Sequence, residues 1–386
     1  MHSTSVPPSS KSLQIIEAFD HFELIYRWLD ILTQLPFSVT FHLNQAYRKE
    51  LENRYSQLNQ VQFYSPQTRQ SWPDYLRQLT DDPDYVWVIS TIGRRPSWFS
   101  PLFSFHSLFV VEHDLNYCNS IRFRPKKIHD PFSVIRGLAT IPWQSSQRQL
   151  MDTAKGYIYP TPALREYGRL HNKRPNKIHL TIPFAGQADS TLQQTSTSGN
   201  FRIVVPGSVR GSVRDYALLT EALDHALIQD GRLMEVHFAG PVMDPTIAAQ
   251  FTDFARKVNR SASYKSRLQE FFYFQGLPFT DYEDLIASAD LLVSPLRPYA
   301  RISNVWEELG KTKISGSVFD AIRFGKRLYV PAWFDPQFTE LFRFRSAQDL
   351  GEQLLQAAKA PPLAPVTYAG YGTEQIKSYW LALFYP

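Results

Sequence analysis

Runs of apolar residues alternate with helix-like periods along most of the first half of the chain. LQIIEAF (13–19), FSVTFHL (37–43) and SLFVVEH (107–113) have the character of buried strands, and several segments between them repeat apolar residues at helical spacing. Strands that alternate with helices favour parallel βαβ units with right-handed crossovers. The pattern therefore predicts a Rossmann-like α/β domain over residues 13–185.

The alternation stops at GQADSTLQQTSTSGN (186–200), which is rich in Ser, Thr, Gln and Gly and has no apolar period. Such a segment is predicted to be a linker. The alternation restarts with FRIVV at residue 201, and we expect a second Rossmann-like domain over residues 201–365. The predicted fold class is thus two doubly wound α/β domains facing each other across a cleft, where a ligand is expected to bind.

Composition fits this picture and excludes several other classes. The chain has 386 residues, of which 43% are hydrophobic and 20% charged, as is typical of globular proteins. A lone cysteine, Cys118, excludes a disulfide framework and a thiolate metal cage and fits a reducing cytosol. No apolar run approaches the roughly 18 residues of a membrane span. Residues 1–12 lack the apolar core of a signal peptide, so we expect a flexible leader.

The net charge of +5 is unevenly placed. Residues 1–196 contain 21 Lys and Arg against 16 Asp and Glu, whereas the remainder contains 20 of each. The excess suggests that the first half meets an anionic partner. An uneven scatter of charges without function would explain so small a difference equally well.

The turn PGSVRGSVRDY (206–216) separates the first strand of the second domain from its helix. In open parallel sheets, ligands bind beyond the carboxyl ends of the strands, where free amides and the helix dipole favour an anion. Gly207 and Gly211 would let the backbone approach a ligand, and Arg210 and Arg214 carry fork-shaped donors that suit phosphate. Taken alone, the segment reads equally as an ordinary turn with solvated arginines.

Other strand exits of the second domain have compatible chemistry. FAGPV (238–242) and VSPLRPY (293–299) end strands in small-residue turns, and KTKISGSVFDAI (311–322) places a lysine and two serines before a helix. We expect these turns at one edge of the sheet, where they would hold a diphosphate. The candidate donor-binding residues from these turns are Gly207, Ser208, Arg210, Arg214, Gly240, Pro295, Lys313, Ser315, Gly316 and Ser317.

Residues 200–335 resemble the nucleotide-binding domain of GT-B glycosyltransferases, especially those of bacterial polysaccharide and lipopolysaccharide synthesis. The resemblance rests on the order of four segments, namely RDYALLTEAL, a strand ending in GP, FQGLPFTDYEDLIASADLLVSPL and SGSVFDAIRFGKRLYVP. The first half matches in layout alone. The resemblance implies transfer of a sugar from a nucleotide diphosphate donor to a glycan or lipid-linked acceptor, with no metal ion or other cofactor. It also implies that a C-terminal helix within residues 366–386 crosses back to the first domain.

One departure from the family pattern concerns the acidic residues near the donor. Many retaining members carry two acids seven residues apart, whereas this chain has Lys313 or Ser315 near the first position and Asp320 near the second. Asp320 is therefore an additional donor-site candidate, and retention or inversion stays open. The sequence shows no Asp-x-Asp pair at a strand end and no His/Cys cluster at ligand spacing, so no metal is expected.

Two histidines of the first half follow predicted strands and are candidate general bases. His21 lies where the first strand enters the first helix, and either Asp20 or Glu23 could orient its ring. His113 follows a fully apolar strand. The alternatives are a helix N-terminus capped by Asp20 and an exposed loop histidine paired with a neighbouring acid. We take His113, His21 and Asp20 as the catalytic candidates.

Basic and aromatic residues mix in two segments of the first half. RRPSWFSPLFSF (94–105) contributes Arg94, Arg95 and Trp98, and IRFRPKKIH (121–129) contributes Arg122, Arg124, Lys126 and Lys127. Such a patch suits an anionic membrane surface or a lipid-diphosphate acceptor, and its composition would also suit single-stranded nucleic acid. Nucleic acid is not expected as a partner, because no binding module is recognisable. A solvated loop is the alternative. The resulting prediction is a cytoplasmic enzyme, peripheral on the inner membrane leaflet.

Two other functions remain open for this fold. The chain could be a glycosyltransferase-like, sugar-binding partner subunit without turnover, because the acidic pair is incomplete. It could also be a sugar-nucleotide epimerase.

Overall fold

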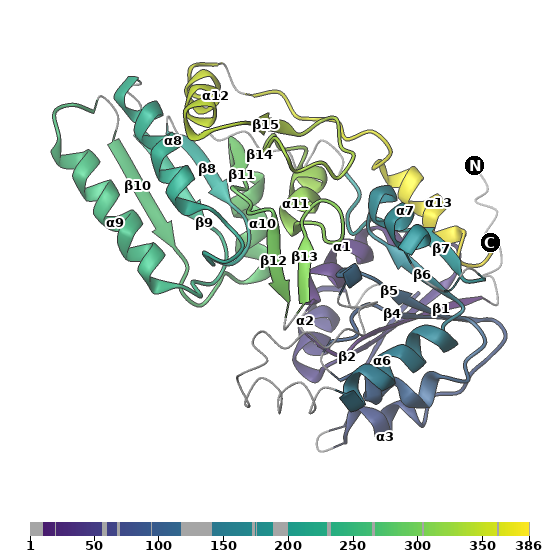
Figure 1. Cartoon of the computed structure of the whole chain (residues 1–386). Coiled ribbons are helices and arrows are strands. Elements are labelled where there is room, and N and C mark those ends of the chain that lie inside the picture. The colour runs from purple at the N-terminus through teal and green to yellow at the C-terminus, as the bar shows by residue number, and fades with distance from the viewer. Residues whose placement is uncertain are drawn as a thin grey trace, which may run out of the picture. The chain divides into compact units, whose positions relative to one another are not determined.

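The computed structural model describes residues 11–19, 21–55, 60–67, 70–93, 95–116, 141–171, 174, 176–187, 200–229, 233–264, 267–302, 305–360 and 363–385. The chain divides into two compact units, one formed by Met1–Phe184 with Glu374–Pro386 and the other by Ala185–Thr373. Figure 1 shows a separate sheet in each unit. Six of the candidate residues lie outside the described residues: Asp20, Arg94, Arg122, Arg124, Lys126 and Lys127. The leader and the predicted linker also lie almost entirely outside them.

The first unit contains a seven-stranded parallel sheet with the order β3-β2-β1-β4-β5-β6-β7 (Figure 1). Its strands are β1 (Ser12–Glu17), β2 (Ser38–Leu43), β3 (Val61–Tyr64), β4 (Tyr85–Ile89), β5 (Leu108–Val111), β6 (Gly156–Tyr159) and β7 (Ile178–Thr181). Its helices are α1 (Phe22–Leu32), α2 (Gln45–Tyr55), α3 (Trp72–Leu76), the 3₁₀ helix η1 (Pro96–Leu102), α6 (Ile141–Thr153), α7 (Pro162–His171) and α13 (Thr373–Leu381). The strand order reverses between β1 and β4, and loops leaving this pair form the customary ligand position of a doubly wound sheet.

The apolar runs of the sequence explain the core of the first unit. All six residues of β1 are buried, as is usual when helices cover both faces of a parallel sheet. The helix α13 packs on this unit, because the indole of Trp380 meets that of Trp28 edge to face with ring centroids 5.0 Å apart. Both indoles are fully buried. The end of the chain therefore completes the first core, although it follows the second unit in sequence.

The second unit contains a six-stranded parallel sheet with the order β10-β9-β8-β11-β14-β15. Its strands are β8 (Phe201–Val205), β9 (Leu233–Phe238), β10 (Arg267–Phe272), β11 (Leu291–Val293), β14 (Leu328–Pro331) and β15 (Phe342–Phe344). Its helices are α8 (Tyr216–Gln229), α9 (Pro245–Arg260), α10 (Phe279–Ala287), α11 (Gly316–Phe324) and α12 (Ala347–Lys359). Here the strand order reverses between β8 and β11, so the exits of these two strands mark the expected ligand position.

The prediction of two Rossmann-like α/β domains is confirmed. An antiparallel hairpin of β12 (Tyr299–Ile302) and β13 (Val305–Glu308) was not predicted from the sequence. In the chain it lies between β11 and α11, and Figure 1 shows it extending away from the sheet of the second unit. The segment is short, and its charged residues hide the two-residue alternation that normally marks a strand.

Candidate functional site

In the first unit, a buried carboxylate joins the exits of β1 and β4. Glu17, the last residue of β1, is fully buried and accepts hydrogen bonds from the hydroxyls of Ser90 and Thr91, both at 2.7 Å. The backbone amide of Phe19 donates a third hydrogen bond to it at 2.8 Å. Burial raises the pKa of Glu17 above its ordinary value, although these hydrogen bonds and the charge of His21 oppose the shift. Glu17 thus ties the loop that leads to His21 to the exit of β4, where Ser90 lies.

His21 forms a histidine–carboxylate pair with Glu23 at the start of α1. Its Nδ1 lies 3.1 Å from Oε1 of Glu23, and about half of its side chain is exposed. A carboxylate accepts hydrogen bonds, so this contact favours a proton on Nδ1 and leaves the lone pair of the neutral ring on Nε2. Despite the desolvation that burial imposes, the hydrogen bond and charge of His21, with the charge of Arg27, hold the pKa of Glu23 below its ordinary value. Of the two acids considered from the sequence, Glu23 is therefore the one seen to pair with His21.

His113 lies beside His21, after β5. The two imidazole rings stack with centroids 5.2 Å apart and an interplanar angle of 17°. Nε2 of His113 donates to the carbonyl of Ser90 at 2.6 Å, because a carbonyl only accepts hydrogen bonds. Phe184 packs against the same ring with a centroid distance of 4.7 Å. The structure thus brings both candidate histidines together, with His113 held more firmly and His21 more open to solvent.

The described part of the basic and aromatic patch packs against Phe19, just after β1. The guanidinium of Arg95 lies 4.7 Å from the ring centroid of Trp98, and that ring stacks on Phe19 at 5.5 Å. Trp98 is half-buried, whereas Arg95 is exposed. Trp98 therefore helps to shape the exit of β1, and a membrane or acceptor role for the patch stays a prediction.

In the second unit, the turn after β8 is organised around Arg214. The side chain is buried, and its two terminal nitrogens donate to the carbonyls of Pro206 at 2.6 Å and Ser208 at 2.8 Å. A Cβ on Gly207, whose φ is +81°, would lie 2.6 Å from the same guanidinium. The alternative of a solvated Arg214 is therefore wrong, because the side chain is buried and both terminal nitrogens bind its own turn. A contact between Arg214 and a phosphate stays a prediction.

Three predicted strand exits, those of β8, β9 and β11, do converge. The amide of Asp215 donates to the carbonyl of Pro295 at 2.6 Å, which ties the start of α8 to the exit of β11. A Cβ on Gly240 would lie 2.6 Å from the amide nitrogen of Ser208, so only glycine permits this close approach of the β9 exit. Arg210 extends from the same turn with an exposed side chain. Among the described residues, no carbonyl or carboxylate is bonded to the guanidinium of Arg210, in contrast to that of Arg214.

The N-terminus of α11 completes this group. Ser315, its N-cap, lies 2.8 Å from the hydroxyl of Ser317, which in turn donates to Ser294 at the end of β11 at 3.0 Å. Gly316 is exposed, and a Cβ there would meet no atom within 4 Å. Open space thus borders the first turn of a helix, where amides and the helix dipole attract anions.

Lys313 and Asp320 occupy different surroundings. Lys313 is half-buried in the turn before α11, and its carbonyl accepts from the amide of Gly310 at 2.7 Å. Asp320 is buried within α11 and accepts a hydrogen bond from the hydroxyl of Tyr282 at 2.7 Å. The carboxylate of Asp320 therefore joins α11 to α10, and its contact with a donor stays a prediction.

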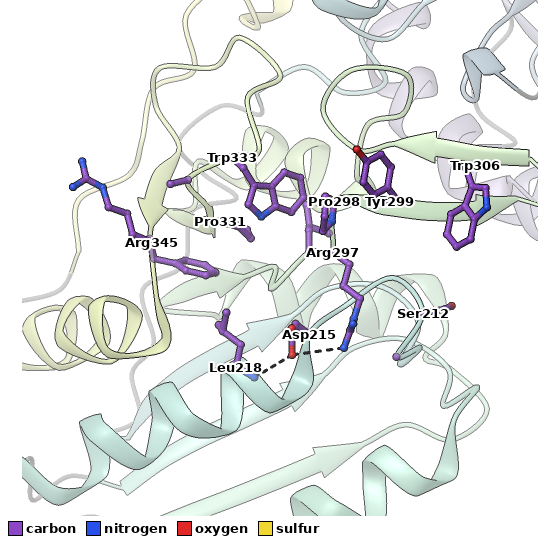
Figure 2. Close-up of a pocket in the computed structure, with 14 residues that line it drawn as sticks. Ser212, Asp215, Leu218, Arg297, Pro298, Tyr299, Trp306, Pro331, Trp333 and Arg345 are labelled. Carbon is purple, nitrogen blue, oxygen red and sulfur yellow. Dashed lines mark hydrogen bonds and ion pairs between the residues drawn. The ribbon is translucent and has the colours of Figure 1, made fainter.

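A pocket of about 720 Å³ in the second unit was not predicted from the sequence. Residues from the start of α8, the exits of β11 and β14, and the hairpin line it (Figure 2). Its lining includes the aromatic side chains of Tyr299, Trp306 and Trp333 together with Asp215 and Arg297. The aromatic residues clustered around the strand exits after 296 and 331 were the signal that could have found it.

Two further properties concern the described parts of the chain. In those parts, no group of three or more His, Cys, Asp or Glu side chains is placed to hold a metal ion, and the metal-independent reaction stays a prediction. Among the described helices, none is long and apolar enough to cross a membrane.

Comparisons with known proteins support the fold. No protein-family profile matches the sequence, and no curated protein is significantly similar to it. Solved structures do match over nearly the whole chain. They include TarM (TM-score 0.56, 10% identity, covering 99% of this chain and 100% of TarM). A UDP-forming alpha,alpha-trehalose-phosphate synthase from Burkholderia xenovorans matches with a TM-score of 0.51 and 12% identity, over 97% of this chain and 95% of that one. A putative UDP-N-acetylglucosamine 2-epimerase from Listeria monocytogenes matches with a TM-score of 0.50 and 12% identity, over 97% of this chain and 95% of that one. The chain therefore has the GT-B fold that the sequence resemblance implied.

Proposed function

We propose that the protein is a glycosyltransferase that moves a sugar from a nucleoside diphosphate donor to a hydroxyl of a glycan or lipid-linked acceptor. The observation that carries the proposal is the convergence of three strand exits, those of β8, β9 and β11, at the switch point of the second sheet, beside the open N-terminus of α11. Leaving diphosphates need this combination of helix amides and a cation. The synthase among the structural neighbours is named as UDP-forming, which agrees with such a donor.

Each part of the second-unit site has a separate task. The first turn of α11, with Ser315 and Gly316, would bind phosphate oxygens through backbone amides. Arg210 would neutralise the charge that develops on the leaving diphosphate, because its exposed side chain extends from the neighbouring turn. Arg214 would act indirectly by holding the carbonyls of Pro206 and Ser208 in place.

The first unit supplies the general base in this proposal. The Nε2 lone pair of His21 would accept the proton of the attacking hydroxyl, and Glu23 would hold the ring and stabilise the imidazolium that forms. A base of this kind favours direct displacement with inversion, which NMR of the product's anomeric proton would test.

The decisive experiment is release of nucleoside diphosphate from UDP-, GDP- and TDP-sugars. We expect turnover with at least one donor, and a loss of roughly 10- to 100-fold in kcat/KM for Arg210→Ala, since a hydrogen bond to a charged group contributes about 1.5–3 kcal/mol. Arg256→Ala, which removes an exposed arginine on α9, is the matched control. If no nucleoside diphosphate is released and UDP, GDP and TDP cause no thermal shift, the result would favour the sugar-binding partner subunit without turnover. Conversion of a nucleotide sugar into its epimer without release would favour the epimerase.

A further inference from the structure

The aromatic pocket of the second unit is separate from the proposed phosphate site. Its lining shares the 211–215 turn with that site but includes neither Arg210 nor any residue of α11. The volume of about 720 Å³ lies within the range of roughly 300–1,000 Å³ that small-molecule sites occupy. Figure 2 shows Trp333, Tyr299 and Trp306 along one side, facing Leu218, Asp215 and Ser212 on the side of α8.

The hairpin directs its aromatic side chains away from the core. Tyr299 pairs with Glu308 and Arg301 with Trp306, so strand alternation places Tyr299 and Trp306 on one face. The opposite face carries Ala300 and Glu307, which are both buried. The hairpin is thus anchored through one face and leaves two large rings, each more than half exposed, on the other.

Trp333 provides a third ring from a different element. It follows β14, is 43% exposed, and meets the fully buried ring of Phe334 edge to face with centroids 6.1 Å apart. The contact with Phe334 therefore restricts the orientation of the Trp333 indole. Three large exposed aromatic side chains in one concave surface indicate a binding site, because such surface is seldom left to water without a function.

The polar groups of the pocket decide which ligand fits the rings. The carboxylate of Asp215 accepts from the amide of Leu218 at 3.2 Å and lies 3.8 Å from the guanidinium of Arg297 (Figure 2). A hydrogen-bond acceptor, the Asp215 carboxylate, and a donor, the Arg297 guanidinium, thus lie close together beside the flat faces of the aromatic rings. A sugar ring has one face of C–H groups and a rim of hydroxyls, each of which both donates and accepts. Asp215 would repel a phosphate, whereas Arg297 and Arg345 of the same lining would attract it, so the aromatic faces rather than the charges favour a saccharide.

We propose that this pocket binds saccharide units of a glycan, with rings stacked on Trp306 and Trp333 and hydroxyls bonded to Asp215 and Arg297. This binding site is additional to the proposed donor site and does not require that the proposed transfer occur. The glycan is either the acceptor of that transfer or a chain that only tethers the protein.

Direct binding tests the proposal. The full chain is screened on a glycan array, and the Kd of each hit is then measured by calorimetry with the free oligosaccharide. We expect Trp306→Ala and Trp333→Ala each to weaken binding at least tenfold while circular dichroism shows a folded protein. Phe274→Ala, which removes an exposed ring outside the pocket, is the matched control and should bind as the native chain does.

Three results would overturn the proposal. They are an array without hits, glycan binding that survives both tryptophan substitutions, and quenching of tryptophan fluorescence by UDP that depends on Trp306 while no oligosaccharide binds.

To distinguish an acceptor glycan from a tethering glycan, each hit is offered as an acceptor together with an activated donor. Elongation identifies the acceptor, and binding without elongation identifies a tether. Either outcome supports a saccharide site, whereas failure of donor turnover alone would concern only the proposed function.

Discussion

The imidazole rings of His21 and His113 stack 5.2 Å apart although 91 positions separate them in the chain. The two differ in their hydrogen bonds. Nε2 of His113 binds a backbone carbonyl, whereas His21 contacts a carboxylate through Nδ1 and has about half of its side chain exposed. This difference assigns the base role in the proposed reaction to His21 and a supporting role to His113.

Replacing His21 by Gln should lower kcat of the proposed transfer by about 10²- to 10⁴-fold, the usual contribution of a general base. Glu23→Gln should cause a smaller loss, because it keeps the contact but removes the charge. Turnover is measured as nucleoside diphosphate released in the presence of acceptor. The control is His225→Gln on the exposed side of α8. A His21→Gln protein with native turnover would contradict the assignment.

Replacing Arg214 by Ala should lower the free energy of unfolding by roughly 2–4 kcal/mol, since two backbone carbonyls in the turn lose their partner. Urea denaturation monitored by circular dichroism measures the change. Arg256→Ala should stay within about 0.5 kcal/mol of the native chain, as exposed substitutions usually do. If Arg214→Ala kept full stability and lost only nucleotide binding, the original phosphate-binding interpretation would be restored.

Two glycines of the candidate donor site should respond in opposite ways. Gly240→Ala places a Cβ against the backbone of Gly207 and Ser208, so we expect a destabilisation of roughly 1–3 kcal/mol. Gly316→Val meets no protein atom within 4 Å of the new Cβ, and stability should change little. The valine should instead reduce the thermal shift that UDP, GDP or TDP produces, because it fills the space beside the α11 amides. A nucleotide shift unaffected by Gly316→Val would place the phosphate elsewhere.

Lys326 should make stability depend on alkaline pH. Burial lowers the pKa of its ammonium from 10.5 to about 8, although the charge of Asp290 opposes the shift. Between these pH values the unfolded chain binds more protons than the folded one, so the free energy of unfolding rises with pH through this window. Between pH 7.5 and 9.5, the free energy of unfolding of Lys326→Met should rise by about 1–2 kcal/mol less than that of the native chain. The prediction would be wrong if urea titrations gave the same pH dependence of the free energy of unfolding for the native chain and for Lys326→Met.

Much of the fold follows from the order of apolar runs, because a parallel strand buried on both faces must be apolar along its whole length. LFVV, the whole of β5, is an example, and strands are present within LQIIEAF, FSVTFHL, SLFVVEH and FRIVV, as expected. The hairpin of β12 and β13 escaped prediction, since one of its faces is buried against a neighbour through Ala300 and Glu307. A buried glutamate in a short charged segment gives no periodic signal.

The sequence by itself determined which residues follow strands, and therefore that His21, His113 and the glycine turns would lie at sheet edges. It could not determine what each side chain contacts there. Only the tertiary structure decided that Glu23 pairs with His21, that Arg214 is buried in its own turn, and that Asp320 binds Tyr282. The physical reason is that strand order follows from local patterns of burial, whereas hydrogen-bond partners depend on distances between segments far apart in the chain.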